Sequence, residues 1–138
     1  MATVKLWTDE EVSADARVSA VFDDIRAARK SEFVNNFWRA LANQPVLLER
    51  TWSSIKEVMM APGELDRLTK ELVYIAVSTI NGCGYCIHSH TAAARAKGLS
   101  DKQHAELLAV IGMAAETNAI ANALQVPVDR EFTIDSAR

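Results

Sequence analysis

The chain has 138 residues and a mass of 15.2 kDa, which fits a single domain able to bury a core without a disulfide or a structural metal. Hydrophobic residues make up 49% and charged residues 24%, so the composition excludes a disordered or fibrous chain. Fifteen Lys and Arg against eighteen Asp and Glu give a net charge of −3, without the basic surplus that binding to nucleic acid requires. We therefore expect one domain over residues 1–138 and no nucleic-acid partner.

The chain carries no obvious membrane signal. Its first ten residues lack the apolar stretch of a signal peptide, and no run of about eighteen apolar residues occurs anywhere. We therefore expect no membrane-spanning helix and a cytoplasmic location. Thiols are kept reduced in the cytosol, so two neighbouring cysteines there are more often catalytic or metal-binding than structural. Both cysteines of this chain form one such pair.

The first half of the chain shows helical spacing of apolar residues and almost no strand pattern. Two helices are predicted before residue 45, one carrying Val18, Val21, Phe22 and Ile25 and the next carrying Val34, Phe37, Trp38 and Leu41. Pro45 suits the first turn of a third helix, whose apolar positions are Leu48, Trp52, Ile55 and Met59.

The second half predicts three more helices after a break at residues 61–63. One runs from about 65 to 80 and ends at Asn81-Gly82, and the next runs from near Cys83 to Gly98, a typical glycine after a helix end. Ser100 and Gln103 predict a capping box for the last helix, which reaches about residue 124. With a polar tail over the last ten residues, the chain reads as an all-α bundle of about six helices.

Two of these helices have unusual composition. Residues 71–80 are apolar almost all round, which predicts a buried helix. The last helix is rich in small residues, namely Ala105, Ala109, Gly112, Ala114, Ala115, Ala119, Ala121 and Ala123. Small side chains allow close approach of another helix, from the same chain or from a second subunit; good helix propensity alone explains them equally well.

The cysteines form a C-x-x-C pair, Cys83-Gly84-Tyr85-Cys86, at the predicted start of a helix. Unpaired N–H groups at a helix start stabilise a thiolate, which is the reacting form of cysteine. The three-residue spacing also allows the two sulfurs to form a disulfide. A redox pair is the favoured interpretation, with a metal site and two inert buried thiols as the alternatives.

His90 and Glu71 are the candidate acid–base residues. At 100° per residue, His90 shares a helix face with both cysteines and lies one turn beyond Cys86. Lys97 falls on the same face but in the last turn, where its side chain can reach solvent. His88 and His104 are expected to face solvent. For Glu71, spacing alone leaves a buried partnered carboxylate and one that reaches solvent, Lys70 or Arg67 equally open.

The order and spacing of these side chains resemble the AhpD-like family, which comprises alkylhydroperoxidase D and carboxymuconolactone decarboxylase. The residues that carry the resemblance are, in chain order, Glu71, Cys83, Cys86, His90, Ala92-Ala93-Ala94 and Gly98. The resemblance covers about residues 45–124. The short, single-domain branch of the family is the better comparison, because the chain is too short for two full helical repeats.

The resemblance implies an all-α fold and a thiol-based peroxidase or disulfide reductase without an organic cofactor. Cys86 would attack the peroxide, Cys83 would resolve the sulfenic acid into a disulfide, and Glu71 and His90 would relay the proton. One departure is Tyr85, which stands where the best-known peroxidases of the family have His and argues against efficient alkyl hydroperoxide turnover. The implied reductant is an external dithiol, such as a lipoyl-bearing or thioredoxin-like protein.

Three alternatives remain from the sequence. A muconolactone-type decarboxylase is disfavoured by the C-x-x-C pair, which members resembling true decarboxylases lack. A zinc module built on Cys83, Cys86 and His90 has only Glu71 as a fourth ligand. A redox sensor without enzymatic activity is the third. Family habit, the small-residue helix and three tryptophans, Trp7, Trp38 and Trp52, further predict a homo-oligomer, with a hexamer favoured over a trimer.

Overall fold

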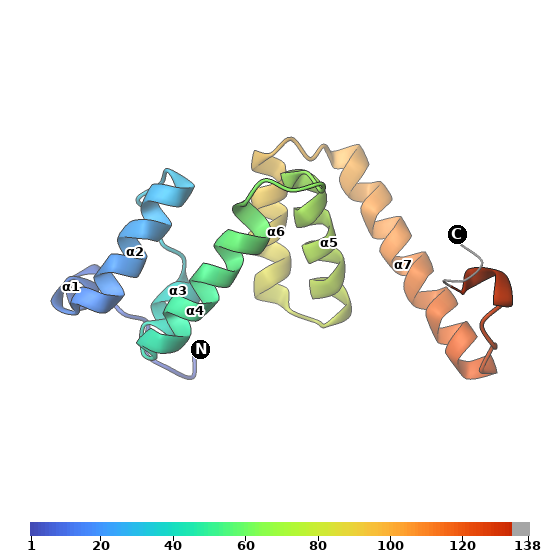
Figure 1. The fold of residues 1–138 in the computed structure, drawn as a ribbon, viewed down its shortest axis with the longest axis horizontal. Coiled ribbons are helices and arrows are strands. Elements are labelled where there is room, and N and C mark those ends of the chain that lie inside the picture. The colour runs from blue at the N-terminus through green and yellow to red at the C-terminus, as the bar shows by residue number, and fades with distance from the viewer. Residues whose placement is uncertain (134–138) are drawn as a thin grey trace. The chain divides into compact units, whose positions relative to one another are not determined.

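The computed structural model describes residues 1–133, and within that range it contains helices and no strand, which confirms the all-α prediction (Figure 1). The helices in chain order are α1 (Asp9–Ala14), α2 (Ala16–Arg29), α3 (Asn36–Leu41), α4 (Pro45–Ile55), the π-helical turn η1 (Lys56–Met60), α5 (Arg67–Ile80), α6 (Gly84–Ala96), α7 (Asp101–Leu124) and the short 3-10 helix η2 (Arg130–Phe132). The chain divides into two compact units, Met1–Pro62 and Gly63–Arg138. The single domain over residues 1–138 stays a prediction.

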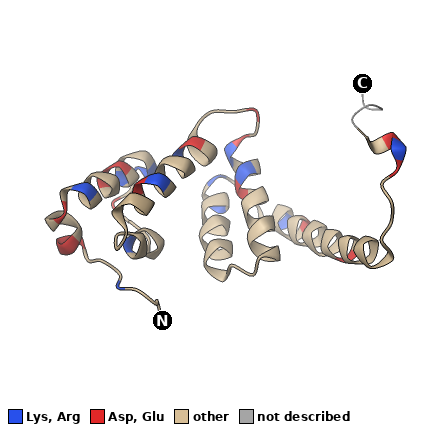
Figure 2. Ribbon diagram, turned by 60° about the horizontal axis from the view of Figure 1, so that its bottom comes forward, with Lys and Arg blue, Asp and Glu red and all other residues tan. Residues whose placement is uncertain are grey.

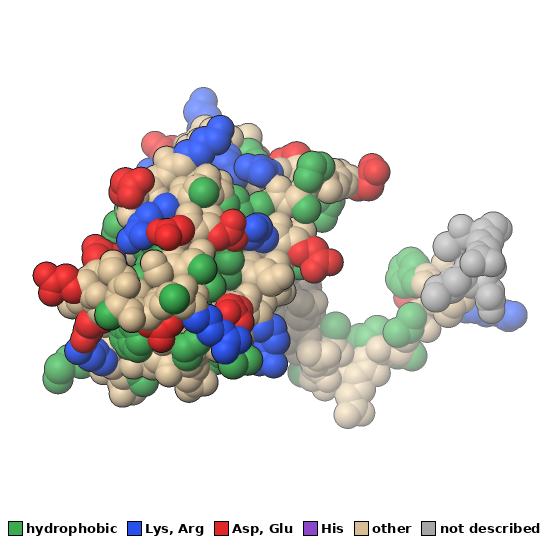
Figure 3. All heavy atoms as spheres, turned by 60° about the vertical axis from the view of Figure 1, so that its left-hand side comes forward, with side chains coloured by type: hydrophobic (Ala, Val, Ile, Leu, Met, Phe, Trp, Pro, Cys, Tyr) green, Lys and Arg blue, Asp and Glu red, His purple; other side chains and the backbone are tan. Residues whose placement is uncertain are grey.

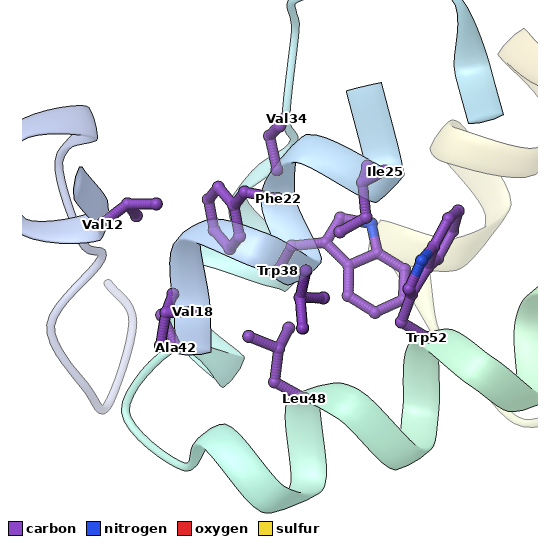
Figure 4. Packing of buried hydrophobic residues seen from close by; sticks show 10 residues of the cluster. Val12, Val18, Phe22, Ile25, Val34, Trp38, Ala42, Leu48 and Trp52 are labelled. Carbon is purple, nitrogen blue, oxygen red and sulfur yellow. The ribbon is translucent and has the colours of Figure 1, made fainter. Parts of the chain in front are cut away.

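The first unit is built around an apolar core contributed by α1, α2, α3 and α4 (Figure 4). Its buried members are Val12, Val18, Val21, Phe22, Ile25, Val34, Trp38, Ala42, Leu48 and Trp52. Trp38 and Trp52 meet edge to face with ring centroids 5.4 Å apart, and Trp7 packs against the same cluster. Of the two readings that the sequence left for the tryptophans, an interface or a core, the structure supports the core, and the homo-oligomer stays a prediction.

The helix boundaries of this unit follow local signals. Pro45 begins α4 as predicted, and Met59 lies in the π-helical continuation of that helix. Helix α1 was not predicted from the sequence, although Thr8 and Glu11 form a capping box at its start. Val34 was assigned to a helix, but it precedes α3 and is buried from an extended segment.

The second unit is centred on an antiparallel pair of helices, α5 and α6, which pack along each other (Figure 1). Asp66 caps the start of α5 by accepting a hydrogen bond from the Thr69 amide. Gly82, with a φ of 68°, provides the left-handed residue that turns the chain from α5 into α6. The predicted capping box of α7 is confirmed, because Ser100 and Gln103 bond reciprocally at its start.

The prediction that residues 71–80 form a buried helix was wrong for one face of α5. Glu71, Ile75 and Ser78 are buried, but Val73, Val77 and Ile80 are each more than half exposed. Periodicity cannot distinguish a face that packs within the chain from one that packs against another chain, since both require apolar side chains. Within residues 1–133, α6 and α7 cover only one side of α5.

Helix α7 is long, apolar and exposed. It spans 24 residues, its mean hydropathy reaches 1.4, and only 6% of its most apolar window is buried. By length and composition alone it could cross a membrane, which the sequence prediction overlooked because small and polar residues interrupt every apolar run. Charged residues are sparse along α7 (Figure 2). Between the end of α7 and residue 133, hydrophobic side chains are also exposed to solvent (Figure 3).

Candidate active site

The cysteine pair lies at the N-terminus of α6, where Cys83 is the N-cap residue and Cys86 belongs to the first turn. The two side chains form a disulfide across a Cα–Cα distance of 5.4 Å, which confirms the pairing that their spacing allowed. The Cys83 sulfur also accepts a hydrogen bond from the Cys86 amide, with the two atoms 3.3 Å apart. One amide of the helix start therefore donates to the Cys83 sulfur, a contact that would stabilise a thiolate there.

The α5–α6 pairing brings Glu71 to His90, which is 19 residues away in sequence. Glu71 Oε2 lies 2.7 Å from His90 Nδ1, and the two side chains are only 8% and 20% exposed. The structure thus selects the buried, partnered reading of Glu71 over the solvent-exposed one. An ionised carboxylate only accepts hydrogen bonds, so Nδ1 is the donor and Nε2 of a neutral imidazole is left as the free base.

Lys97 is the second partner of Glu71. Its Nζ lies 3.0 Å from Glu71 Oε1, so the two carboxylate oxygens have different partners. The sequence placed Lys97 on the same helix face as His90, with a side chain able to reach solvent; the side chain is 31% exposed, but the bond of its ammonium group to Glu71 was missed. The sequence did contain a signal for this contact, because Lys97 and His90 share one face of their helix. A lysine two turns from His90 on that face can reach a carboxylate that is bonded to the histidine.

The protonation state of Glu71 follows from these contacts. Burial on its own raises the pKa of this carboxyl, but the hydrogen bonds from His90 and Lys97, with the attraction of the lysine charge, outweigh it. The net result is a pKa below the ordinary glutamate value. Glu71 is therefore ionised at neutral pH and holds His90 as a hydrogen-bond acceptor.

Tyr74 is another residue that the sequence did not single out. Its ring stacks on the imidazole of His90, with centroids 3.5 Å apart and planes inclined by 18°. Tyr74 lies one turn after Glu71 on α5, so the same helix face supplies both the hydrogen-bond partner and the stacking partner of His90. Together they fix the plane and the orientation of the imidazole.

The other candidates lie outside this cluster. His88 is exposed, as predicted, whereas His104 is half-buried on α7 rather than facing solvent. Tyr85, between the cysteines, is 45% exposed. The site therefore consists of two neighbouring parts, the disulfide at the start of α6 and the Glu71–His90–Lys97 cluster that begins one turn beyond Cys86.

Comparison with known proteins agrees with this arrangement. The model of the carboxymuconolactone decarboxylase family matches residues 47–129. The chain belongs to this family. The crystal structure of an alkylhydroperoxidase AhpD core from Rhodospirillum rubrum is 62% identical, with a TM-score of 0.94 over 96% of this chain and 97% of that chain. The AhpD-like resemblance seen in the sequence is thereby confirmed.

Curated relatives of this family member carry the name alkyl hydroperoxide reductase AhpD. The one from Maricaulis maris is 45% identical over 67 residues, which cover 49% of this chain and 36% of the relative. The one from Hyphomonas neptunium is 29% identical over 119 residues, which cover 82% of this chain and 64% of the relative. The chain thus spans roughly one third to two thirds of the length of these relatives.

The geometry also bears on the metal alternative for this member of the carboxymuconolactone decarboxylase family. Among residues 1–133, no group of three or more His, Cys, Asp and Glu side chains is arranged to hold a metal ion. Cys83 and Cys86 bond to each other, and His90 bonds to Glu71. A zinc module built from these residues therefore has no geometric support in that part of the chain.

Proposed function

We propose that the protein is a thiol-dependent oxidoreductase, an alkylhydroperoxidase-like peroxidase that cycles between a Cys83–Cys86 dithiol and a disulfide. The observation that carries the proposal is a disulfide at a helix start with a partly buried imidazole, held by Glu71, one turn further along the same helix. The AhpD names of the structural neighbour and of the curated relatives support the same reaction class.

In the oxidative half of the cycle, His90 accepts the Cys86 thiol proton, directly or through one water, and the imidazolium is stabilised by Glu71. The Cys86 thiolate attacks one oxygen of the peroxide and the O–O bond breaks; the other oxygen takes the proton back from the His90 imidazolium and leaves as an alcohol, or as water when the substrate is hydrogen peroxide. Cys86 is then a sulfenic acid. The Cys83 sulfur attacks the Cys86 sulfur, expels water and forms the disulfide, so that two electrons have passed from the thiols to the peroxide.

Two physical terms decide which sulfur attacks. The helix start favours Cys83 as the thiolate by about 0.3–1 kcal/mol, or about 2 kcal/mol when partly buried. A positioned base contributes about 10²–10⁴ in rate, equivalent to about 3–5 kcal/mol, and His90 is one turn from Cys86 but two from Cys83. The base outweighs the helix start, so Cys86 is assigned as the nucleophile and Cys83 as the resolving thiol.

The reductive half requires an external dithiol, whose thiolate attacks the disulfide and leaves oxidised as the Cys83–Cys86 dithiol is restored. A lipoyl-bearing or thioredoxin-like protein has this chemistry. Because the cycle depends on re-reduction, we place it in the cytoplasm, where thiols are kept reduced. The decarboxylase that gives the family its name is disfavoured, since loss of carbon dioxide has no use for a two-electron thiol pair.

Helix α7 supports a homo-oligomer. Its exposed large apolar residues are Leu108, Val110, Met113, Ile120 and Leu124, and α5 adds Val73, Val77 and Ile80. Large apolar side chains exposed on two helices that pack together are typical of an interface. Glu106 and Glu116 on α7 oppose burial in lipid, so the proposed cover is further copies of this chain, with a hexamer favoured over a trimer.

Light scattering tests the oligomer. The wild type is expected to have a mass of six times 15.2 kDa. The double variant Met113→Asp, Ile120→Asp is expected to have the mass of one chain. The matched control is the pair Asn118→Asp and Asn122→Asp, because it adds the same two negative charges at exposed polar positions on the opposite face of α7. A wild-type mass of 15.2 kDa, or flotation of the wild type with anionic vesicles, would contradict the assembly.

The reaction is tested on the reduced protein in a stopped-flow instrument with hydrogen peroxide, tert-butyl hydroperoxide and cumene hydroperoxide, followed by a count of free thiols. A peroxidase is expected to lose both thiols for each equivalent of peroxide. If both thiols persist with every peroxide but oxidise readily with a small disulfide, the protein is a disulfide reductase. Thiols inert to both classes would contradict the proposal.

A further inference from the structure

Lys97 is the one member of the Glu71–His90–Lys97 cluster to which the reaction above gives no task. It ends α6, its ammonium donates to Glu71 Oε1, and it also lies 3.3 Å from the carbonyl oxygen of Ala93. A lysine at a helix end is commonly only a cap, since a cation there interacts favourably with the last carbonyls. The contact with a buried carboxylate that is already bonded to a histidine goes beyond that role.

We propose that Lys97 is a positioning residue of the thiol centre, which holds Glu71 by the oxygen that His90 leaves unused and thereby keeps His90 oriented to accept the thiol proton. The inference rests on the proposed function, because it specifies how the base of that reaction is prepared. Lys97 acts through Glu71 and takes no part in bond making or breaking.

The charge balance of the cluster gives the direction of the effect. With Lys97 protonated, Glu71 ionised and His90 neutral, the net charge of the three side chains is zero. One further proton on His90 gives the cluster a net positive charge. Without Lys97 the same state carries a negative charge, which attracts a proton to His90 or Glu71. Removing a cation therefore makes every nearby proton harder to remove.

Titratable and charged groups lie on all three helices that pack at this site. On α5, Tyr74 stacks on His90, and Arg67 and Lys70 lie in the turn before Glu71. On α6, they are the cysteines, the exposed His88, His90, Arg95 and Lys97. Helix α7 also packs on α5; its Asp101, Lys102 and Glu106 are exposed to solvent and His104 is half-buried. Asp101 pairs with Arg95, and the hydrogen bonds to the Glu71 carboxylate come from His90 and Lys97.

The geometry adds an orienting effect. A carboxylate bonded at both oxygens is fixed in rotation, and this one has His90 on Oε2 and Lys97 on Oε1. Fixing the carboxylate fixes Nδ1 of His90 as the donor and leaves Nε2 as the atom that accepts the thiol proton. Arginine at position 97 can supply the same charge and donors, whereas methionine keeps the stem but removes both.

The test compares wild type, Lys97→Met, Lys97→Arg and Lys102→Met, which removes the same charge from an exposed position of α7. The rate of thiol oxidation by hydrogen peroxide is measured against pH, and the ring protons of His90 are titrated by NMR in the reduced protein. Lys97→Met is expected to move the acidic limb and the His90 titration to higher pH, because the loss of a nearby cation makes the proton on His90 harder to remove. Lys97→Arg is expected to restore both, and Lys102→Met to leave both in place.

The outcomes separate the two proposals. A Lys97→Met protein that is slower by the same factor at every pH, with an unmoved His90 titration, would overturn the inference and leave the peroxidase intact. A wild type inert to peroxides and disulfides, with a His90 titration that still moves in Lys97→Met, would overturn the function while supporting the charge effect. Equal shifts in Lys97→Met and Lys102→Met would reduce the effect to net charge and also overturn the inference.

Discussion

Both units of the chain have a buried apolar cluster, but only the second also buries the carboxylate of a candidate site, Glu71. In Met1–Pro62, the interior is aromatic and aliphatic, and the charged groups pair at the surface, as Arg17 does with Glu49. In Gly63–Arg138, a glutamate and a histidine are largely buried, while valines, leucines and isoleucines of α5 and α7 are exposed. Burial of polar side chains and exposure of apolar side chains both lower the stability of the folded state, so both features indicate a functional role. Substitutions in the core of the first unit are therefore expected to lower the free energy of unfolding. Substitutions in the polar cluster of the second unit are expected to lower the rate of thiol oxidation.

The largest effect is expected from the cysteines of the second unit. Cys86→Ser should abolish reaction with peroxide, because it removes the attacking thiolate. Cys83→Ser should consume one equivalent of peroxide and stop at a sulfenic acid, which dimedone traps and mass spectrometry detects. If Cys86→Ser forms the trappable sulfenic acid and Cys83→Ser is inert, the roles are reversed, and the helix start outweighs the base.

The next effect concerns the base. Glu71→Gln and His90→Ala should slow the first oxidation step by about 10²–10⁴-fold, the usual contribution of a positioned base, while both thiols remain countable. His88→Ala is the matched control, since His88 lies on the same helix but is exposed. Stopped-flow rates at pH 7 measure all three variants. An unchanged rate in His90→Ala would remove the imidazole from the mechanism.

The first unit should respond in stability. Trp38 is 1% exposed and contacts Trp52 edge to face, so Trp38→Ala should lower the free energy of unfolding by about 3–5 kcal/mol. Phe33→Ala, at a side chain that is 71% exposed, should change it by less than about 1 kcal/mol. Denaturant unfolding followed by tryptophan fluorescence measures both. Equal losses from the two variants would mean that the core described here does not carry the stability of this unit.

Local signals allowed much of this molecule to be predicted from sequence. Pro45, the Ser100–Gln103 capping box and Gly98, with a φ of 98°, act within a few residues, and each ends or begins a helix where expected. The cysteine pairing is local in the same sense. Thr8 and Glu11 gave an equally local signal for α1, but too few apolar residues accompanied it to indicate a helix.

The contacts that were missed cross from one helix to another. Lys97 and Tyr74 reach Glu71 and His90 only because of the register in which α5 packs on α6, and no spacing within one helix fixes that register. The exposure of Val73 and Val77 was missed for a related reason. Periodicity identifies an apolar face, but the surface that covers it depends on tertiary or quaternary packing.

The smallest expected effect concerns Tyr74, whose ring lies 3.5 Å, centroid to centroid, from that of His90. An aromatic pair contributes about 0.5–1.5 kcal/mol beyond simple burial, so Tyr74→Leu should slow thiol oxidation by about three- to tenfold by loosening the imidazole. Tyr74→Phe keeps the ring and should react at nearly the wild-type rate. Stopped-flow oxidation at several pH values measures the rate of each variant, and circular dichroism checks that each variant remains folded. If Tyr74→Phe falls as far as Tyr74→Leu, the phenolic hydroxyl rather than the stacked ring is what the site uses. The polar character of the second unit would then extend to a further residue of α5.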